Sequence, residues 1–285
     1  MNPGLWGVLT ALSWGGSDFT ARFVSSRIGH VAALLGTLVV GALLLSLCAA
    51  IDASPVRWAA ASWPLVLVAS LGLVAGTFWL YEAIGRGPVS IVAPIASCYP
   101  ALVVALALAF GARPGAVQWG GMALVTAGGI VIARSTDRFV DEGTRSRKAL
   151  RYTVLVAFGS AAAFAASVFA AQRLVPAFGN LHTAWLTRLI SLVLLLAALA
   201  LTRAWPGVPR RFVPWLGLQG ALDSGGYLAL YAGSAGADAH IAAVTSSAYG
   251  GVTTVLAWLF LGERVGPAQW LGIVLIIAGV ALLSA

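Results

Sequence analysis

Charged residues are scarce in this chain, and their scarcity excludes a water-soluble globular protein. Only 9% of the 285 residues are Asp, Glu, Lys or Arg, 60% are hydrophobic, and the mean hydropathy is +0.93. A soluble domain carries about 25% charged residues. A chain this poor in charge cannot cover a surface in contact with water, so we expect lipid to be its solvent.

Cysteine and lysine are also rare. Cys48 and Cys98 both fall within apolar runs, so no disulfide framework is predicted. The single lysine, Lys148, lies in a charged segment, which excludes a Gly-Lys-Ser/Thr nucleotide loop, and neither His-Glu-x-x-His nor Gly-x-Gly-Asp occurs. We therefore expect no enzyme activity, no cofactor and no metal. An intramembrane lipid-modifying enzyme that uses Asp or His stays as an alternative.

The net charge of +8 does not indicate nucleic-acid binding, because the cations lie between apolar runs, as they do in membrane loops. A spanning helix needs about 20 apolar residues. Ten stretches of that kind follow one another, and the first is expected to be a retained helix. We predict an all-α integral membrane protein with helices over residues 5–23, 31–51, 63–84, 89–110, 115–133, 152–174, 181–202, 213–233, 239–260 and 267–284.

An internal repeat is the most specific feature of the sequence. Residues 81–133 align with 231–284 at an offset of 150, which becomes 151 after one inserted residue. The matches are Trp14, Ser17 and Phe19 with Phe164, Ser167 and Phe169; Tyr81, Ile91, Ser97, Tyr99 and Phe110 with Tyr231, Ile241, Ser247, Tyr249 and Phe260; and Gly111, Arg113, Gly115, Gln118, Trp119, Gly121 and Gly128 with Gly262, Arg264, Gly266, Gln269, Trp270, Gly272 and Gly279.

The repeat predicts three regions: a first five-helix repeat over 1–133, a charged cytoplasmic linker over 134–151, and a second repeat over 152–285. Because five spans are an odd number, the second copy enters the membrane inverted, which places a substrate site between the copies and permits alternating access. Glycines recur every seven residues in the fifth and tenth stretches, so we expect these two helices to meet along their glycines.

Lys and Arg are concentrated on one side of this topology, together with the 134–151 linker. The positive-inside rule then places the linker in the cytoplasm and both termini outside it. We expect a multi-pass protein of the bacterial inner membrane. One chain holds both repeats, so a monomer is sufficient, with the lipid bilayer and a small-molecule substrate as its partners.

The sequence resembles the ten-helix, EamA-type branch of the drug/metabolite transporter superfamily over nearly its whole length. The resemblance rests on Trp14-Gly15, the run 93–100, and the run 260–264 that leads into 269–272. It implies a bacterial exporter of amino acids or metabolites. Proteins of this branch have a Gly-Glu pair after the fourth and ninth helices; here Gly262-Glu263 retains it, whereas the first half has Gly111-Ala112.

Polar residues within lipid are costly and therefore indicate function or pairing. Gln219, Asp223, Tyr227 and Tyr231 recur every four residues and share one helical face. Hydroxyl groups and aromatic rings on facing helices suit a small amphiphilic solute, although they can also simply join helices. The predicted substrate-binding residues are Trp14, Phe78, Tyr81, Glu82, Ser97, Tyr99, Arg188, Asp223, Tyr227, Tyr231, Ser246, Ser247 and Tyr249.

The intramembrane charges allow two interpretations each. Arg188 needs a partner, for which Asp223 is the candidate, and it serves either as an anchor for a substrate carboxylate or as half of a structural ion pair. Asp18 is a proton carrier or a helix-end partner of Arg22 at i+4, and Glu82 stands in the same relation to Arg86. These charges lack like-charged counterparts in the other half, which predicts a symmetric scaffold around an asymmetric cavity.

The predicted function is a secondary transporter that exports small organic solutes, such as amino acids, by alternating access. A channel or a non-transporting scaffold would also be compatible with the sequence. Pro94 and Pro100 interrupt the fourth stretch, and the interruption is either a hinge or a packed kink.

Overall fold

The computed structural model describes residues 3–52, 62–109, 115–134, 147–233, 246 and 248–283, and every regular element in these ranges is helical. The elements are α1 (Pro3–Ile28), α2 (His30–Asp52), α3 (Trp63–Arg86), α4 (Val89–Ala96), α5 (Tyr99–Ala109), α6 (Ala116–Arg134), α8 (Arg147–Phe178), α9 (Asn180–Thr202), the 3-10 helix η2 (Arg210–Phe212), α10 (Val213–Gly233), α12 (Tyr249–Leu261) and α13 (Pro267–Leu283).

Four of the described helices, α2, α3, α8 and α9, are long and apolar enough to cross a bilayer. Shorter apolar segments cover 89–103, 119–132, Tyr249–Leu261 and Pro267–Gly279. The chain is therefore an all-helical membrane protein, while the expected total of ten spans stays a prediction.

The outer surface of the bundle is apolar, and its interior contains small polar residues among the apolar ones. Its most exposed large apolar side chains each expose more than 60% of their surface: Leu43, Ile51, Leu155, Val193, Leu201 and Phe260. Small hydroxyl residues are fully buried at Thr37, Ser70, Ser90, Ser160, Ser191, Thr253 and Thr254. This distribution suits a lipid surround, in which helices associate through small residues and interhelical hydrogen bonds.

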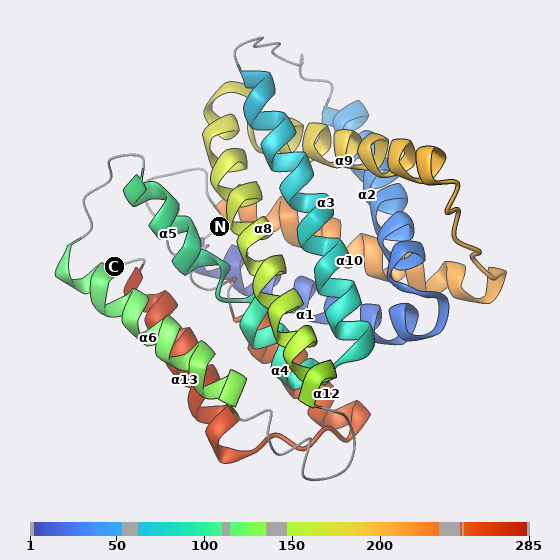
Figure 1. The fold of residues 1–285 in the computed structure, drawn as a ribbon. Coiled ribbons are helices and arrows are strands. Elements are labelled where there is room, and N and C mark those ends of the chain that lie inside the picture. The colour runs from blue at the N-terminus through green and yellow to red at the C-terminus, as the bar shows by residue number, and fades with distance from the viewer. Residues whose placement is uncertain are drawn as a thin grey trace.

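The main helix pairs join one half of the chain to the other. Helix α3 packs along α8, α1 along α10, and α6 along α13 (Figure 1). Under the 150-residue repeat, α1 to α6 belong to the first half and α8 to α13 to the second. The halves therefore interlock and do not form two separate bundles.

The first two helices of each half are joined by the same turn. Gly29 and Gly179, which are 150 residues apart, both have a positive φ, of 86° and 77°. Each N–H donates to the carbonyl four residues earlier, at 3.1 Å to Ser25 and 2.8 Å to Val175. Only glycine adopts this conformation without strain, so both helices end at the same register.

The expected helix over 89–110 is wrong as a single element. It divides into α4 and α5 around Ser97 and Cys98, whose hydroxyl and thiol donate to the Pro94 carbonyl at 2.8 and 3.4 Å. Pro100 has no N–H to continue the α-helical ladder. The break is therefore capped locally by side chains and is buried in the bundle.

Two other boundaries differ from the sequence prediction. Helix α8 begins at Arg147, five residues before the expected start, so the end of the charged segment 134–151 is helical. In the stretch expected over 239–260, α12 begins at Tyr249, and residues 239–245 and 247 lie outside the described residues.

Glu263 joins the two halves at the start of α4. Its two carboxylate oxygens accept the backbone N–H groups of Val89 at 3.0 Å and Ser90 at 2.9 Å. These donors have no partner within their own helix, and the helix dipole favours a negative charge there. Ala112, the counterpart of Glu263 in the first half, has no side chain that could do the same.

The glycine strips of α6 and α13 meet, as their spacing predicts. A Cβ on Gly128 would lie 2.6 Å from the carbonyl oxygen of Gly272, and one on Gly279 would lie 2.7 Å from that of Gly121. Residue numbers rise on one helix as they fall on the other, so the helices run antiparallel. The absence of side chains lets the two backbones approach this closely.

Hydrogen bonds between the halves occur in equivalent pairs. On α1, the Ser17 hydroxyl donates to the carbonyl of Gln219 on α10 at 3.1 Å. On α8, the Ser167 hydroxyl donates to the carbonyl of Ala69 on α3 at 2.7 Å. The two donors are 150 residues apart in the sequence, and so are the two acceptors. Exchanging the two halves therefore converts one hydrogen bond into the other.

A second pair repeats this relation seven residues, or about two helical turns, further along. Thr10 donates to the Gly226 carbonyl at 3.3 Å, and Ser160 donates to the Gly76 carbonyl at 2.8 Å. Contacts that map onto themselves when the partners are exchanged are typical of a two-fold interface. The two halves therefore meet at equivalent surfaces.

Candidate functional site

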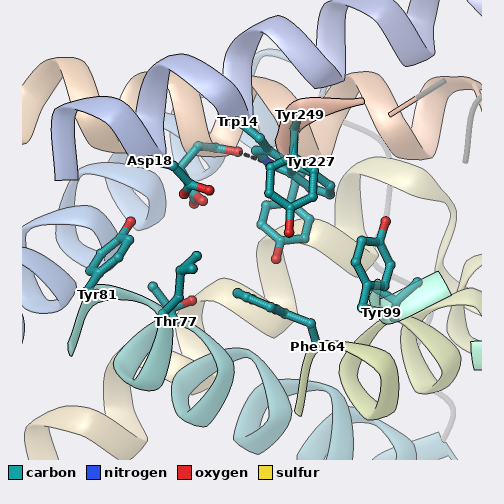
Figure 2. A pocket seen from close by; sticks show the side chains of 11 residues that line it. Trp14, Asp18, Thr77, Tyr81, Tyr99, Phe164, Tyr227 and Tyr249 are labelled. Atoms are coloured by element: carbon teal, nitrogen blue, oxygen red, sulfur yellow. Dashed lines mark hydrogen bonds between the residues drawn. The ribbon is translucent and has the colours of Figure 1, made fainter. Parts of the chain in front are cut away.

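A cavity lies between the two halves and contains about 430 Å³ of atom-free space, its mouth included. Helices α1, α3 and α5 of the first half and α8, α10 and α12 of the second contribute its wall (Figure 2). The lining residues are Trp14, Asp18, Thr77, Leu80, Tyr81, Tyr99, Phe164, Val168, Asp223, Tyr227 and Tyr249.

Trp14 is the centre of an aromatic cluster in this wall. Its ring meets Tyr227 edge-on at 4.9 Å and Tyr249 edge-on at 5.7 Å between centroids. Its indole N–H donates to the backbone carbonyl of Asp223 at 3.2 Å, which fixes the ring against α10. Gly226 provides the space, because a Cβ there would collide with the indole. The cluster is held by these contacts and presents ring surface to the cavity.

Arg188 and Asp223 form the predicted ion pair. The guanidinium Nη2 lies 2.5 Å from Asp223 Oδ2, and the guanidinium carbon lies 5.2 Å from the centre of the Tyr227 ring. Arg188 is 2% exposed and its Nε and Nη1 have no hydrogen-bond partner among the described residues. Gly41 makes room for it, since a Cβ there would lie 3.1 Å from Nε. The pair sits behind the wall, with only Asp223 reaching the cavity.

Asp18 also reaches the cavity. Its i+4 neighbour Arg22 donates to the carbonyls of Ile84 and Gly85 at the end of α3, both at 2.8 Å. Asp18 is 6% exposed, and its Oδ2 has no hydrogen-bond partner in the described part of the chain. Figure 2 shows its carboxyl group directed toward the space above Thr77. The interpretation of Asp18 as one end of a simple helix-end pair does not account for this position.

The wall is built from positions that the repeat makes equivalent. Four pairs, each 150 residues apart, line the cavity from opposite halves: Trp14 with Phe164, Asp18 with Val168, Thr77 with Tyr227, and Tyr99 with Tyr249. Phe164 lies over Gly76 just as Trp14 lies over Gly226. The aromatic framework is thus shared, and the acidic group stands on one side only.

A buried polar network supports the cavity at Tyr81. The Tyr81 hydroxyl lies 3.3 Å from that of Thr37, which accepts a hydrogen bond from the Gln219 amide at 2.8 Å. The three side chains come from α3, α2 and α10. They hold one tyrosine of the wall in place from behind.

No group of three His, Cys, Asp or Glu side chains gathers anywhere in the described ranges, so these residues do not form a metal site.

The EamA-like transporter family matches the chain twice, over residues 2–134 and 151–285. The chain belongs to the EamA-like transporter family. The two matches cover the two halves that the repeat defines, and they place the cavity at the boundary between two copies of the family unit.

Two further proteins resemble this EamA-like chain. The spermidine export protein MdtI of Salmonella paratyphi A (strain ATCC 9150 / SARB42) is 30% identical over 108 residues, which are 38% of this chain and 95% of that relative. A protein of solved crystal structure matches 98% of this chain and 97% of its own length, with a TM-score of 0.68 at 18% identity. This second likeness shows a shared fold.

Of the residues predicted for the EamA-like site, six line the cavity: Trp14, Tyr81, Tyr99, Asp223, Tyr227 and Tyr249. Tyr231 is buried one layer behind, 6.0 Å from the Tyr227 ring, and Ser246 is a buried hydrogen-bond partner of Tyr99. Ser97 is used by the helix break, and Ser247 lies outside the described residues. Their roles in binding stay predictions.

Phe78 and Glu82 are not among the lining residues. Phe78 contacts the ring of His30 edge-on at 4.7 Å. Glu82 pairs with Arg86 at 3.1 Å and accepts the Tyr152 hydroxyl at 2.9 Å. The expected i+4 pair of Glu82 is confirmed within α3, and the hydrogen bond from Tyr152 ties α3 to α8.

The structure adds Asp18, Thr77, Leu80, Phe164 and Val168 to the residues predicted for the wall. Two of these residues could have been predicted from the internal repeat of the sequence. Phe164 is the counterpart of Trp14, and Thr77 is the counterpart of Tyr227. Leu80 and Val168 carry no polar group that would distinguish them from ordinary helix packing.

Proposed function

We propose that the chain is a secondary carrier that exports small organic solutes, such as amino acids or related metabolites, by alternating access through the cavity between its halves. The observation that carries the proposal is the composition of the wall, in which equivalent positions of both halves face one cavity. The family and the named export activity of MdtI support a transporter of small solutes.

The way the contacts between the halves exchange supports inverted halves. Ser17 and Ser167 make the same hydrogen bond with the halves exchanged, and Gly128 meets Gly272 as Gly279 meets Gly121. A two-fold axis generates such contacts. If each half crosses the membrane five times, that axis lies in the membrane plane, and each half can adopt the conformation of the other.

Counterflow in liposomes tests the carrier. Vesicles that contain the purified chain are loaded with an unlabelled solute and mixed with the same solute in labelled form, over a panel of amino acids, amines and organic acids. A carrier gives a saturable transient accumulation of label. A channel gives flux in both directions without that transient, and the absence of exchange across the whole panel would refute the proposal.

A pair of tryptophan substitutions tests whether the solute passes through the cavity. Trp14→Ala removes the centre of the aromatic cluster and should lower counterflow at least about tenfold, the effect expected for a central aromatic anchor. Trp79→Ala removes a ring of α3 that is 39% exposed at the outer surface and should leave it unchanged. Equal rates in the two variants would place the path elsewhere.

We propose the bacterial inner membrane as the location, with segment 134–151 in the cytoplasm. Lys148 and Arg173 lie near opposite ends of α8, and 25 residues of helix span about 37 Å. In intact cells a membrane-impermeant thiol reagent should label Arg173→Cys and spare Lys148→Cys. The reverse labelling pattern would show that segment 134–151 lies outside the cytoplasm.

A further inference from the structure

Among the described residues, Asp223 has a charged partner and the other cavity carboxylate, Asp18, has none. It is 94% buried, and its Oδ2 has no hydrogen-bond partner among the described residues. An isolated ionised carboxylate in such a place costs several kcal/mol. Either a bound proton or a bound cation would remove this free-energy cost. Of the two, the cation can be part of a substrate.

The charges around the cavity are unbalanced. Two of its eleven lining side chains, Asp18 and Asp223, are acidic, and none is Lys, Arg or His. Arg188 stands behind the wall and pairs with Asp223. One negative charge remains when both carboxylates are ionised, which matches a ligand with one positive charge.

The rest of the wall suits the remainder of such a ligand. Trp14, Tyr227 and Tyr249 form connected edge-on contacts beside the acidic groups, and aromatic faces attract organic cations. Across the cavity, α3 and α8 present Leu80, Phe164 and Val168. Figure 2 shows Asp18 on one wall with Phe164 on the other. The cavity thus has an acidic side and an apolar side.

A substrate carboxylate finds no complement here. The lining residues include no cationic side chain, and the two carboxyl groups of the wall, on Asp18 and Asp223, repel a further carboxylate when they are ionised. An amino-acid zwitterion would have to bring its carboxylate close to Asp18 or Asp223 or leave it without a charged partner, and either arrangement weakens binding.

We propose that this cavity selects organic monoamines with an apolar or aromatic body, that Asp18 binds the ammonium group, and that zwitterionic amino acids bind less tightly. The proposal rests on the proposed carrier function, keeps small organic solutes as its substrates, and favours amines over the amino acids named there. Asp18 is then a specificity-determining residue on α1, and its counterpart Val168 contributes to the apolar side.

Four compounds with the same phenyl body and different charge provide the test: 2-phenylethylamine, phenylalanine, 3-phenylpropanoate and 2-phenylethanol. Their binding to the purified full chain in lipid nanodiscs is measured by calorimetry at pH 7. One charge-assisted hydrogen bond corresponds to about ten- to a hundredfold in affinity. We expect the amine to bind more tightly than the other three by that factor.

Substitutions assign the preference to Asp18. Asp18→Asn should reduce amine affinity about ten- to a hundredfold and leave 2-phenylethanol unchanged, whereas Asp18→Glu should retain the amine preference. Asp52→Asn removes an exposed carboxylate at the end of α2 and should change nothing. If Asp18→Asn does not fold, as judged by gel filtration, the ranking of the four compounds on the unaltered chain decides.

The outcomes separate this inference from the carrier function. Equal binding of the four compounds, or unchanged amine binding by folded Asp18→Asn, overturns the assignment of amines. Saturable counterflow of phenylalanine or 3-phenylpropanoate without amine binding overturns it as well, while the carrier function stands. If no solute of any charge exchanges in liposomes, the proposed function itself fails.

Discussion

Replacing Gly128 by alanine tests how closely the two glycine strips pack. A Cβ at this position would lie 2.6 Å from the Gly272 carbonyl oxygen and 2.8 Å from Cγ1 of Ile276. Ordinary contacts of a Cβ atom begin near 3.4 Å, so α6 and α13 must separate locally by about 0.8 Å. Both contacts lie on α13, and the nearer one is backbone that cannot rotate away.

The size of the effect follows from two opposing contributions. Inserting a methyl group into a tightly packed interface costs about 1–3 kcal/mol, through displaced backbone and lost dispersion contacts. Alanine also favours a helix over glycine by about 1 kcal/mol. Gly120→Ala on the same helix isolates this second contribution, because no heavy atom lies within 4 Å of its Cβ. The Gly128→Ala chain should therefore be less stable than the Gly120→Ala chain by about 1–3 kcal/mol.

Unfolding in mixed micelles of increasing SDS content measures this difference. Trp119 on α6 and Trp270 on α13 provide fluorescence signals within the helix pair. The Gly120→Ala midpoint should equal or exceed that of the unaltered chain, and the Gly128→Ala midpoint should fall below it. Equal midpoints for the two variants would refute the close backbone contact.

Three other substitutions test contacts between helices, by the same titration. Glu263→Ala removes the acceptor of two backbone N–H groups at the start of α4 and should lower the free energy of unfolding by about 0.5–2 kcal/mol; an unchanged midpoint contradicts the cap. Arg188→Met leaves Asp223 without its buried partner and should cost about 3–5 kcal/mol, most of which the added Asp223→Asn should recover; an additive double variant argues against the pair. Ser167→Ala removes one bond between α8 and α3 and should cost about 0.5–1.5 kcal/mol; a stabilised variant would show that this bond contributes nothing.

The sequence predicts those features that rest on local spacing or on the cost of charge in lipid. Seven-residue spacing predicts the meeting of the glycine strips, since residues seven apart on a helix lie on one face. The pairing of Arg188 with Asp223 is predictable because a deeply buried guanidinium needs a counter-charge, and Asp223 is the candidate in a facing helix. Both predictions are confirmed.

The sequence is a poor guide where a side chain has a choice between neighbours on different helices. Arg22 stands one turn from Asp18, yet its guanidinium reaches the carbonyls at the end of α3. Glu82 carries the same i+4 signal, and there the pair forms. Only the positions of the neighbouring helices decide between the two outcomes, so Asp18 emerges as a cavity residue from the structure alone.

The hydrogen bonds between the two halves allow the side chains of the halves to differ. The acceptors of the equivalent hydrogen bonds are backbone carbonyls, so Gln219 and Ala69 serve equally well although their side chains have nothing in common. These hydrogen bonds require a specific side chain only at the donor position, where a hydroxyl group is needed. A position on α1 or α8 that faces the cavity is free of this requirement, and there the halves diverge to Asp18 and Val168. The two-fold framework therefore places no constraint on the charge of the cavity, and we expect a single substitution in one half to change which solutes it accepts.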